Sequence, residues 1–205
     1  QQKYEVETNL EIKKELSNHI SRYKNLQLAK KVGLNSAYGA LGSQYFRFFD
    51  VRQAEGITLA GQLSIRWIEN HINQYMNNLL KTNEVDYVLA SDTDSIYLNL
   101  GPLVDKVYSK TTDVNNLISF MDRVCEDKLQ PSIDESYQKL ADYVHAYEQK
   151  MQMKREVLAD KAIWTAKKRY ILHVHNSEGV QYAEPQIKIQ GLEAIKSSTP
   201  SACRE

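Results

Sequence analysis

Two aspartates separated by one threonine are the residues of this sequence best suited to chemistry. Asp92, Thr93 and Asp94 lie between two short apolar runs, residues 87–90 and 96–98. Carboxylates held together beside apolar strands favour neutralisation by cations. Their oxygens suit Mg²⁺ or Mn²⁺, and two such ions can hold the attacking and leaving oxygens of a phosphoryl transfer. The pattern therefore indicates metal-dependent phosphoryl transfer, although an isolated acidic turn is more often a solvated loop.

A second group of polar residues follows one face of an expected helix. Lys31, Asn35 and Tyr38 recur at helical spacing, so an ammonium, an amide and a phenol form one stripe. A lysine can hold a triphosphate as a point charge, and a tyrosine ring can pack beside a base. The stripe is compatible with nucleotide binding and also with an ordinary solvated helix face.

A third group is basic. Lys167, Lys168 and Arg169 precede Tyr170 at the expected start of a strand, and they supply a local positive patch suited to nucleic acid. An exposed strand end is the simpler alternative. His173 and His175 alternate along the same strand, but neither has a carboxylate or cysteine at ligand spacing nearby in the sequence, which favours a structural role.

The elements that carry these groups follow from periodicity. Apolar residues at helical spacing predict a helix over 17–40, ended by Gly39 and Gly42, and a second over 53–80. The acidic turn with its flanking apolar runs predicts a β-hairpin that Gly101 and Pro102 terminate. The second helix is expected to face the core with Ile57, Ala60, Leu63, Trp67, Ile68, Ile72 and Tyr75.

The second half of the chain predicts a helical region and then a sheet. Residues 113–149 are helical, with Pro131 as a bend or boundary. Strands are expected at 151–158, 164–174 and 182–189, the last two joined by a turn at 176–179. Helices interspersed with antiparallel strands make an α+β domain.

Composition limits the class of protein. The chain has 205 residues, with Lys+Arg and Asp+Glu at 26 each, so a nucleic-acid surface must be local. Cys125 and Cys203 lack disulfide or zinc spacing, and no apolar stretch predicts a membrane segment. The start at Gln1, without an initiator methionine, suggests a piece of a longer protein.

Taken together, the motifs resemble the family B (alpha-like) DNA polymerases, most closely those of large tailed bacteriophages. The resemblance runs from about Ser21 to the C-terminus, with the motifs in the family's order. The matching positions are Lys31, Asn35, Ser36, Tyr38 and Gly39 of the fingers K-x-x-x-N-S-x-Y-G motif, Asp92-Thr93-Asp94 of the palm D-T-D motif, Lys167 to Tyr170 of the K-K-R-Y motif, and Gly191-Leu192-Glu193 with Ser197 to Pro200 of a phage-type segment.

The resemblance implies an antiparallel palm sheet flanked by long helices, with a protruding helical fingers arm. The fingers arm would span residues 1–42, the palm 43–196 and the start of the thumb 197–205. Asp94 would bind both of two Mg²⁺ ions, with Mn²⁺ as an alternative, while Asp92 would take a less direct part. Glu156 aligns with a further palm carboxylate beside the metals.

Substrate contacts are implied in the same way. Lys31 and Asn35 would face the incoming dNTP, with Lys31 on its phosphates, and Tyr38 would pack at the nascent base pair. Lys168 resembles a minor-groove contact to the primer-template DNA. Its supporting residues in the motif are Lys167, Arg169 and Tyr170.

Two departures from the family pattern affect these expectations. Ser91 replaces the usual glycine, and the D-x-x-S-L-Y-P-S motif, which supplies the other metal-binding aspartate, would lie before Gln1. The exonuclease and first palm segment, and the thumb, would then lie outside this sequence, either elsewhere on the same chain or on another chain. The expected function is template-directed nucleotidyl transfer, incomplete in this piece alone, in the cytoplasm of an infected bacterium and with a sliding clamp.

Two other functions remain alternatives. The chain could be an inactive DNA-binding or structural palm module that works only with a complementary chain. A nucleotidyl cyclase-like palm is disfavoured, because the fingers stripe and the basic strand would then have no role.

Overall fold

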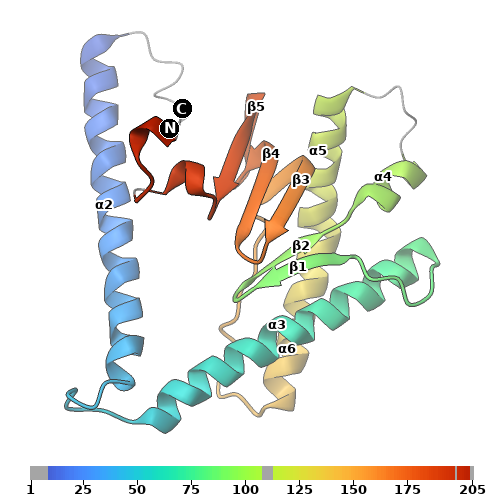
Figure 1. The fold of residues 1–205 in the computed structure, drawn as a ribbon. Helices are drawn as coiled ribbons and strands as arrows, with labels where there is room; N and C mark the ends of the chain where they lie inside the picture. The colour runs from blue at the N-terminus through green and yellow to red at the C-terminus, as the bar shows by residue number, and fades with distance from the viewer. Residues whose placement is uncertain (1–8, 108–112, 197, 204–205) are drawn as a thin grey trace. The chain divides into compact units, whose positions relative to one another are not determined.

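The computed structural model describes residues 9–107, 113–196 and 198–203 (Figure 1). These residues divide between Ala60 and Gly61 into two compact units, which are described in turn. Helices and antiparallel strands confirm the predicted α+β class. The predicted domain limits at 1–42, 43–196 and 197–205 stay predictions, and part of the last range lies outside the described residues.

The first unit consists of helix α2 (Leu10–Leu41), a short connector and the beginning of helix α3 (Val51–Leu80). The Asn9 side chain accepts the backbone N–H of Glu11 at 3.0 Å and so caps the start of α2. Gly42 caps its end, as predicted. No side chain of α2 is buried, so the helix presents both polar and apolar residues to its surroundings.

Helices build the core of the second unit. The C-terminal part of α3 packs with α4 (Gly101–Val107), α5 (Val114–Val124), the π-helical segment Cys125–Leu129 and α6 (Gln130–Tyr143). The buried cluster consists of Ile68, Ile72, Met76, Leu80, Tyr87, Leu103, Met121, Cys125, Leu129, Ile133, Tyr137 and Leu140.

Pro131 marks a change of helix type. It lies in the first turn of α6, directly after the π-helical segment, where the backbone N–H of Gln130 reaches the carbonyl of Cys125. A proline has no backbone N–H to donate and is tolerated in the first turn of a helix. The predicted boundary at Pro131 is therefore confirmed.

Two antiparallel sheets complete this unit (Figure 1). Strands β1 (Val88–Asp92) and β2 (Ser95–Leu98) form the predicted hairpin with the aspartates at its tip. Strands β3 (Val157–Ala166), β4 (Arg169–Ser177) and β5 (Val180–Gln190) form the second sheet, with β4 in the centre.

Several predicted boundaries are wrong. The hairpin does end before Gly101 and Pro102, but residues 101–107 form a helix that was not predicted, α4, with Pro102 in its first turn, where a proline fits. The strand expected at 151–158 begins only at Val157, and the run expected at 164–174 is split by a turn at Lys167 and Lys168. Two antiparallel strands this close in sequence need such a turn, and exposed lysines are suited to it.

The apolar face of α3 was predicted only in part. Ile68 and Ile72 are buried and Trp67 is half-buried, with its Nε1 donating to the carbonyl and hydroxyl of Ser136 at 3.1 Å. Ile57 and Leu63 are instead exposed. Within the described residues, no helix combines the length and the apolar character needed to cross a membrane.

We expect Ile72→Ala to destabilise the second unit by about 2–5 kcal/mol, because it removes a side chain packed on all sides. Ile72 is 1% exposed, whereas Leu63 on the same helix is 41% exposed. Leu63→Ala is the matched control and should change the free energy of unfolding by less than about 1 kcal/mol. Urea denaturation measures both, and equal losses for the two variants would contradict this account of the core.

Candidate functional site

The tip of the β1–β2 hairpin holds the two aspartates. The backbone N–H of Asp94 donates to the carbonyl of Asp92 at 2.6 Å, and Thr93 between them has φ of 55°. A β-branched residue rarely adopts this left-handed conformation, so the turn is tightly constrained. Asp92 is partly buried, and its Oδ1 accepts the Thr93 hydroxyl at 3.0 Å, whereas Asp94 is exposed.

Two asparagines of α3 position this hairpin. The Asn73 Oδ1 accepts the backbone N–H of Tyr87 at 2.8 Å. The Asn77 side chain both donates to the Val85 carbonyl, at 2.8 Å, and accepts from the Val85 N–H, at 3.0 Å. These side-chain amides make the hydrogen bonds that a neighbouring strand would otherwise make with the segment that enters β1. They therefore attach the hairpin to the helical core.

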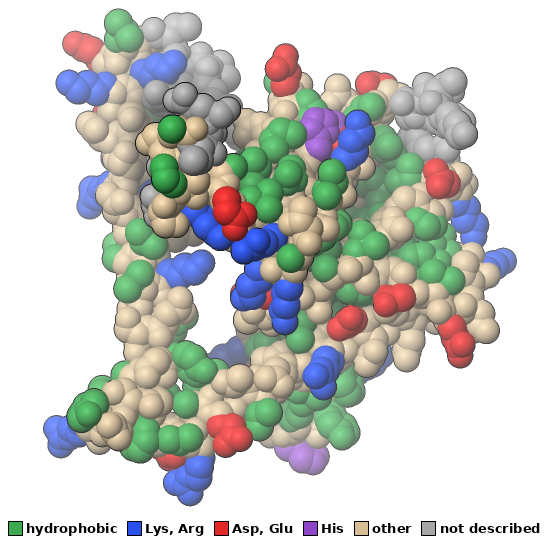
Figure 2. Space-filling model, viewed as in Figure 1, with side chains coloured by type: hydrophobic (Ala, Val, Ile, Leu, Met, Phe, Trp, Pro, Cys, Tyr) green, Lys and Arg blue, Asp and Glu red, His purple; other side chains and the backbone are tan. Residues whose placement is uncertain are grey.

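The basic residues occupy the tip of a different hairpin. Lys167 and Lys168 form the turn between β3 and β4, and Lys168 has φ of 64°. Its Nζ lies 3.3 Å from Oδ1 of Asp92, so the acidic and basic hairpin tips meet. Arg169 pairs with Glu193 at 3.2 Å. Figure 2 shows Lys and Arg side chains gathered over this end of the β3–β4 hairpin.

Three aromatic side chains hold the two hairpins together. The ring of Tyr97 on β2 lies edge-on to Trp164 on β3 and to Tyr170 on β4, with centroids 5.3 and 5.4 Å apart. Burial, followed by the hydrogen bond to Tyr170, raises the pKa of Tyr97 well above its usual range. Tyr97 therefore stays neutral beside Asp92 and adds no charge to the site.

Gly191 fixes the backbone of the basic turn. Its φ is 68°, and a Cβ at this position would lie 2.1 Å from the carbonyl oxygen of Lys168. Only a glycine permits so close an approach. Gly191, the first residue of the phage-type segment, thus supports the turn from its position directly after β5. Ser197 of the same segment lies outside the described residues.

Glu156 lies at the entrance to β3, and its neighbour Arg155 anchors this segment. Arg155 forms an ion pair with Asp122 of α5 and donates to Oδ1 of the buried Asn176 at 2.9 Å. The Glu156 side chain is exposed. Arg155 was missed in the sequence, because neither of its partners is close to it along the chain.

The predicted metal ligands are not gathered into one three-residue group. Among the described residues, a single group of three acidic, histidine or cysteine side chains is close enough to share an ion, and it consists of Asp160, His173 and His175. Asp92 and Asp94 are brought together at one hairpin tip, whereas Glu156 does not join them in such a group.

The polar stripe lies on α2 and belongs to the first unit. Lys31, Asn35 and Tyr38 are all exposed, and the Tyr38 hydroxyl lies 2.8 Å from the hydroxyl of Thr58 on α3. Lys31 forms no ion pair with any residue that the structure describes.

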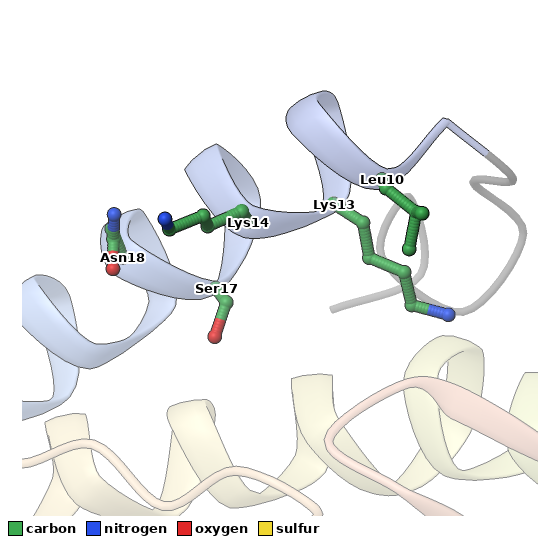
Figure 3. Close-up of a pocket in the computed structure, with 5 residues that line it drawn as sticks. All are labelled: Leu10, Lys13, Lys14, Ser17 and Asn18. Carbon is green, nitrogen blue, oxygen red and sulfur yellow. The ribbon is translucent and has the colours of Figure 1, made fainter.

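A shallow pocket occupies the first turns of the same helix. Its lining residues are Leu10, Lys13, Lys14, Ser17 and Asn18 (Figure 3). At 1.5 Å per residue, Lys31 lies about 20 Å along the helix from Asn18, so the stripe is not part of this pocket.

Comparison with known proteins identifies the family. The family described as DNA polymerase family B matches residues 3–199. The chain belongs to this family. It is 40% identical over 188 residues to the DNA-directed DNA polymerase of Escherichia phage RB69 and 42% identical over 188 residues to that of Enterobacteria phage T4. Each match covers 87% of this chain and 21% of the relative.

A more distant relative also matches most of this chain. The chain is 25% identical over 182 residues to a protein named DNA polymerase beta from African swine fever virus, covering 83% of this chain and 14% of the relative. The resemblance inferred from the motifs is thus confirmed, and the chain spans about a fifth of the length of its phage relatives.

We expect Gly191→Ala to destabilise the chain more than Gly179→Ala. Both glycines have positive φ, so each variant should lose about 1 kcal/mol from backbone strain. No atom lies within 4 Å of a Cβ at Gly179, whereas at Gly191 the Lys168 carbonyl must move, which adds about 1–3 kcal/mol. Chemical denaturation measures the difference, and equal losses would contradict the close approach.

Proposed function

We propose that this chain forms most of the palm and one helix of the fingers of a DNA-directed DNA polymerase of bacteriophage type. Membership of family B and the names of the phage relatives support the class of reaction. The observation that carries the proposal is the 3.3 Å contact between Lys168 and Asp92. This contact supports the proposal because a basic turn that would bind the primer-template lies beside a pair of carboxylates that would hold the metal ions.

Asp94 and Asp92 are the residues that would hold divalent metal ions, with Mg²⁺ as the physiological ion and Mn²⁺ as a substitute. Their chemistry fits, because hard cations prefer carboxylate oxygens. The Asp94 carboxylate makes no hydrogen bond or ion pair with the described residues, whereas Asp92 shares its Oδ1 with Thr93 and Lys168. Two ions would lower the pKa of the primer hydroxyl and neutralise the pyrophosphate. Glu156 is a further candidate ligand in the assembled enzyme.

Lys168 would exchange partners when DNA binds. Its ion pair with Asp92 joins side chains that are 63% and 29% exposed, and a pair of this kind contributes at most about 1 kcal/mol. Acceptor atoms in the minor groove of the primer-template can therefore replace Asp92 at little cost. The exchange would also release Asp92 toward the metal ions, while Lys167, Arg169 and Tyr170 support the DNA contact.

The stripe on α2 would bind the incoming dNTP. Lys31 would hold the phosphates, Asn35 would lie beside it, and Tyr38 would pack at the new base pair. The exposure of all three side chains and the absence of an ion pair at Lys31 within the described residues support this role. The hydrogen bond between Tyr38 and Thr58 would restrict the ring before substrate arrives.

The remaining parts of the enzyme would come from outside this sequence. The second metal-binding aspartate, the exonuclease and the thumb would be supplied by other segments of the polymerase, on the same or another chain. A sliding clamp and the cytoplasm of an infected bacterium complete the proposed setting. Primer extension by the 205-residue chain alone would contradict the proposal that it needs these parts.

We expect Asp94→Asn to lower primer extension by the complete polymerase about a thousandfold or more, because a metal-binding carboxylate is lost. Primer-template affinity should change little. Asp127→Asn, at an exposed aspartate of the π-helical segment, is the matched control and should extend primers normally. Retained turnover in Asp94→Asn, measured with Mg²⁺ under single-turnover conditions, would refute the metal assignment.

We expect Lys31→Ala to raise the dNTP concentration needed for half-maximal incorporation by about 10–100-fold, since a hydrogen bond to a charged group contributes about 1.5–3 kcal/mol. Lys30→Ala removes the same charge from the neighbouring position of α2 and should have a much smaller effect. Pre-steady-state incorporation measures both variants. Equal effects of the two would show that only the overall charge of the helix matters.

A further inference from the structure

One cluster of ligand-type side chains lies outside the proposed polymerase site. Asp160 of β3 and the histidines His173 and His175 of β4 direct their polar atoms at one another. Oδ1 of Asp160 is 2.6 Å from Nδ1 of His173 and 3.1 Å from Nε2 of His175. All three ligand atoms lie within 4.8 Å of one another.

Irregular strand pairing brings these residues together. His173 and His175 are two residues apart on β4 and so point to the same face of the sheet. Opposite them, the register shifts twice, between Leu158 and Ala159 and again between Ala159 and Lys161. Asp160 and His175 are the residues left without a partner at these two shifts. Such bulges redirect side chains and are frequent beside functional sites.

The two histidines and the aspartate differ in exposure. The side chain of His175 is only 10% exposed, and its buried Nε2 has the Asp160 carboxylate, 3.1 Å away, as its polar neighbour. A nitrogen so nearly excluded from water depends on such a carboxylate, or on a bound ion, for a partner. The side chains of His173 and Asp160 are 31% and 36% exposed, so one side of the cluster is open to solvent.

We infer that Asp160, His173 and His175 form a binding site for a transition-metal ion of the Zn²⁺ type, with water as the fourth ligand. Two imidazoles and one carboxylate are a ligand set that Zn²⁺ accepts with an open position. Ligands about 2.0–2.1 Å from a tetrahedral ion are about 3.3 Å apart, so the separations between the ligand atoms need to change by about 1.5 Å at most. Two nitrogen ligands disfavour Mg²⁺, which prefers oxygen.

The site is separate from the proposed polymerase metals. His173 is five residues beyond Lys168, which corresponds to about 16 Å along an extended strand. A bound ion would join β3 to β4 at the shifted pairs and so stabilise the strands that carry the basic turn. The inference does not depend on the polymerase proposal, because it concerns metal binding in the absence of DNA and dNTP.

Titration calorimetry of the metal-free full chain with ZnCl₂ tests the inference. We expect one tight Zn²⁺ per chain, not displaced by an excess of MgCl₂. Loss of a residue that only orients a ligand weakens metal binding about 10–100-fold, so loss of a ligand in Asp160→Asn or His173→Gln should weaken it about 100-fold or more. Zn²⁺ should also raise the melting temperature of the unmodified chain and not that of these variants.

Two controls make the result decisive. His145→Gln changes an exposed histidine outside the cluster, and Asp94→Asn removes a proposed polymerase ligand, so both should bind Zn²⁺ as the unmodified chain does. Circular dichroism checks that each variant folds. If Asp160→Asn does not fold, the result for His173→Gln, which changes a partly exposed side chain, decides the test. Absence of tight binding, its survival in His173→Gln, or its loss in Asp94→Asn would overturn the inference.

Discussion

The meeting of two hairpin tips from different sheets is the geometric constraint that the surrounding elements of the second unit satisfy. Asp92 lies at the end of β1, and Lys168 lies in the turn between β3 and β4, with 3.3 Å between their charged atoms. The ion pair is too exposed to hold the tips in place, since such pairs contribute at most about 1 kcal/mol. The position of the tips must therefore come from their supports.

Three supports fix this geometry without using the charged groups themselves. The aromatic cluster of Tyr97, Trp164 and Tyr170 joins the hairpins, at about 0.5–1.5 kcal/mol for each ring pair beyond burial. Gly191 lets β5 approach the backbone of Lys168. Asparagines on α3 fix the entry to β1. Because the supports are neutral, the charged side chains stay free to exchange partners, as binding of DNA and metal ions would require.

Local patterns predicted the parts of the fold that depend on local physics. The helices α2 and α3, the acidic hairpin and the boundary at Pro131 follow from periodicity and from the properties of glycine and proline. The turn at Lys167 and Lys168 was not predicted, because it depends on which strands pair.

Strand pairing also explains why Asp160, the partner of the two histidines, was not predicted from the sequence. The sequence favoured a structural role for His173 and His175, since no carboxylate stands near them along the chain. Asp160 reaches them only because two register shifts face each other across β3 and β4. The roles of Asp94, Glu156 and Lys31 stay predictions, because they concern ligands and segments beyond this chain. The most direct test of the central claim is a titration of the full chain with Mn²⁺ followed by NMR. If the two hairpin tips form one cation-binding site, the amide signals of Thr93 and Asp94 and those of Lys167 and Lys168 should broaden together. Broadening at one tip alone, or at neither, would contradict the account.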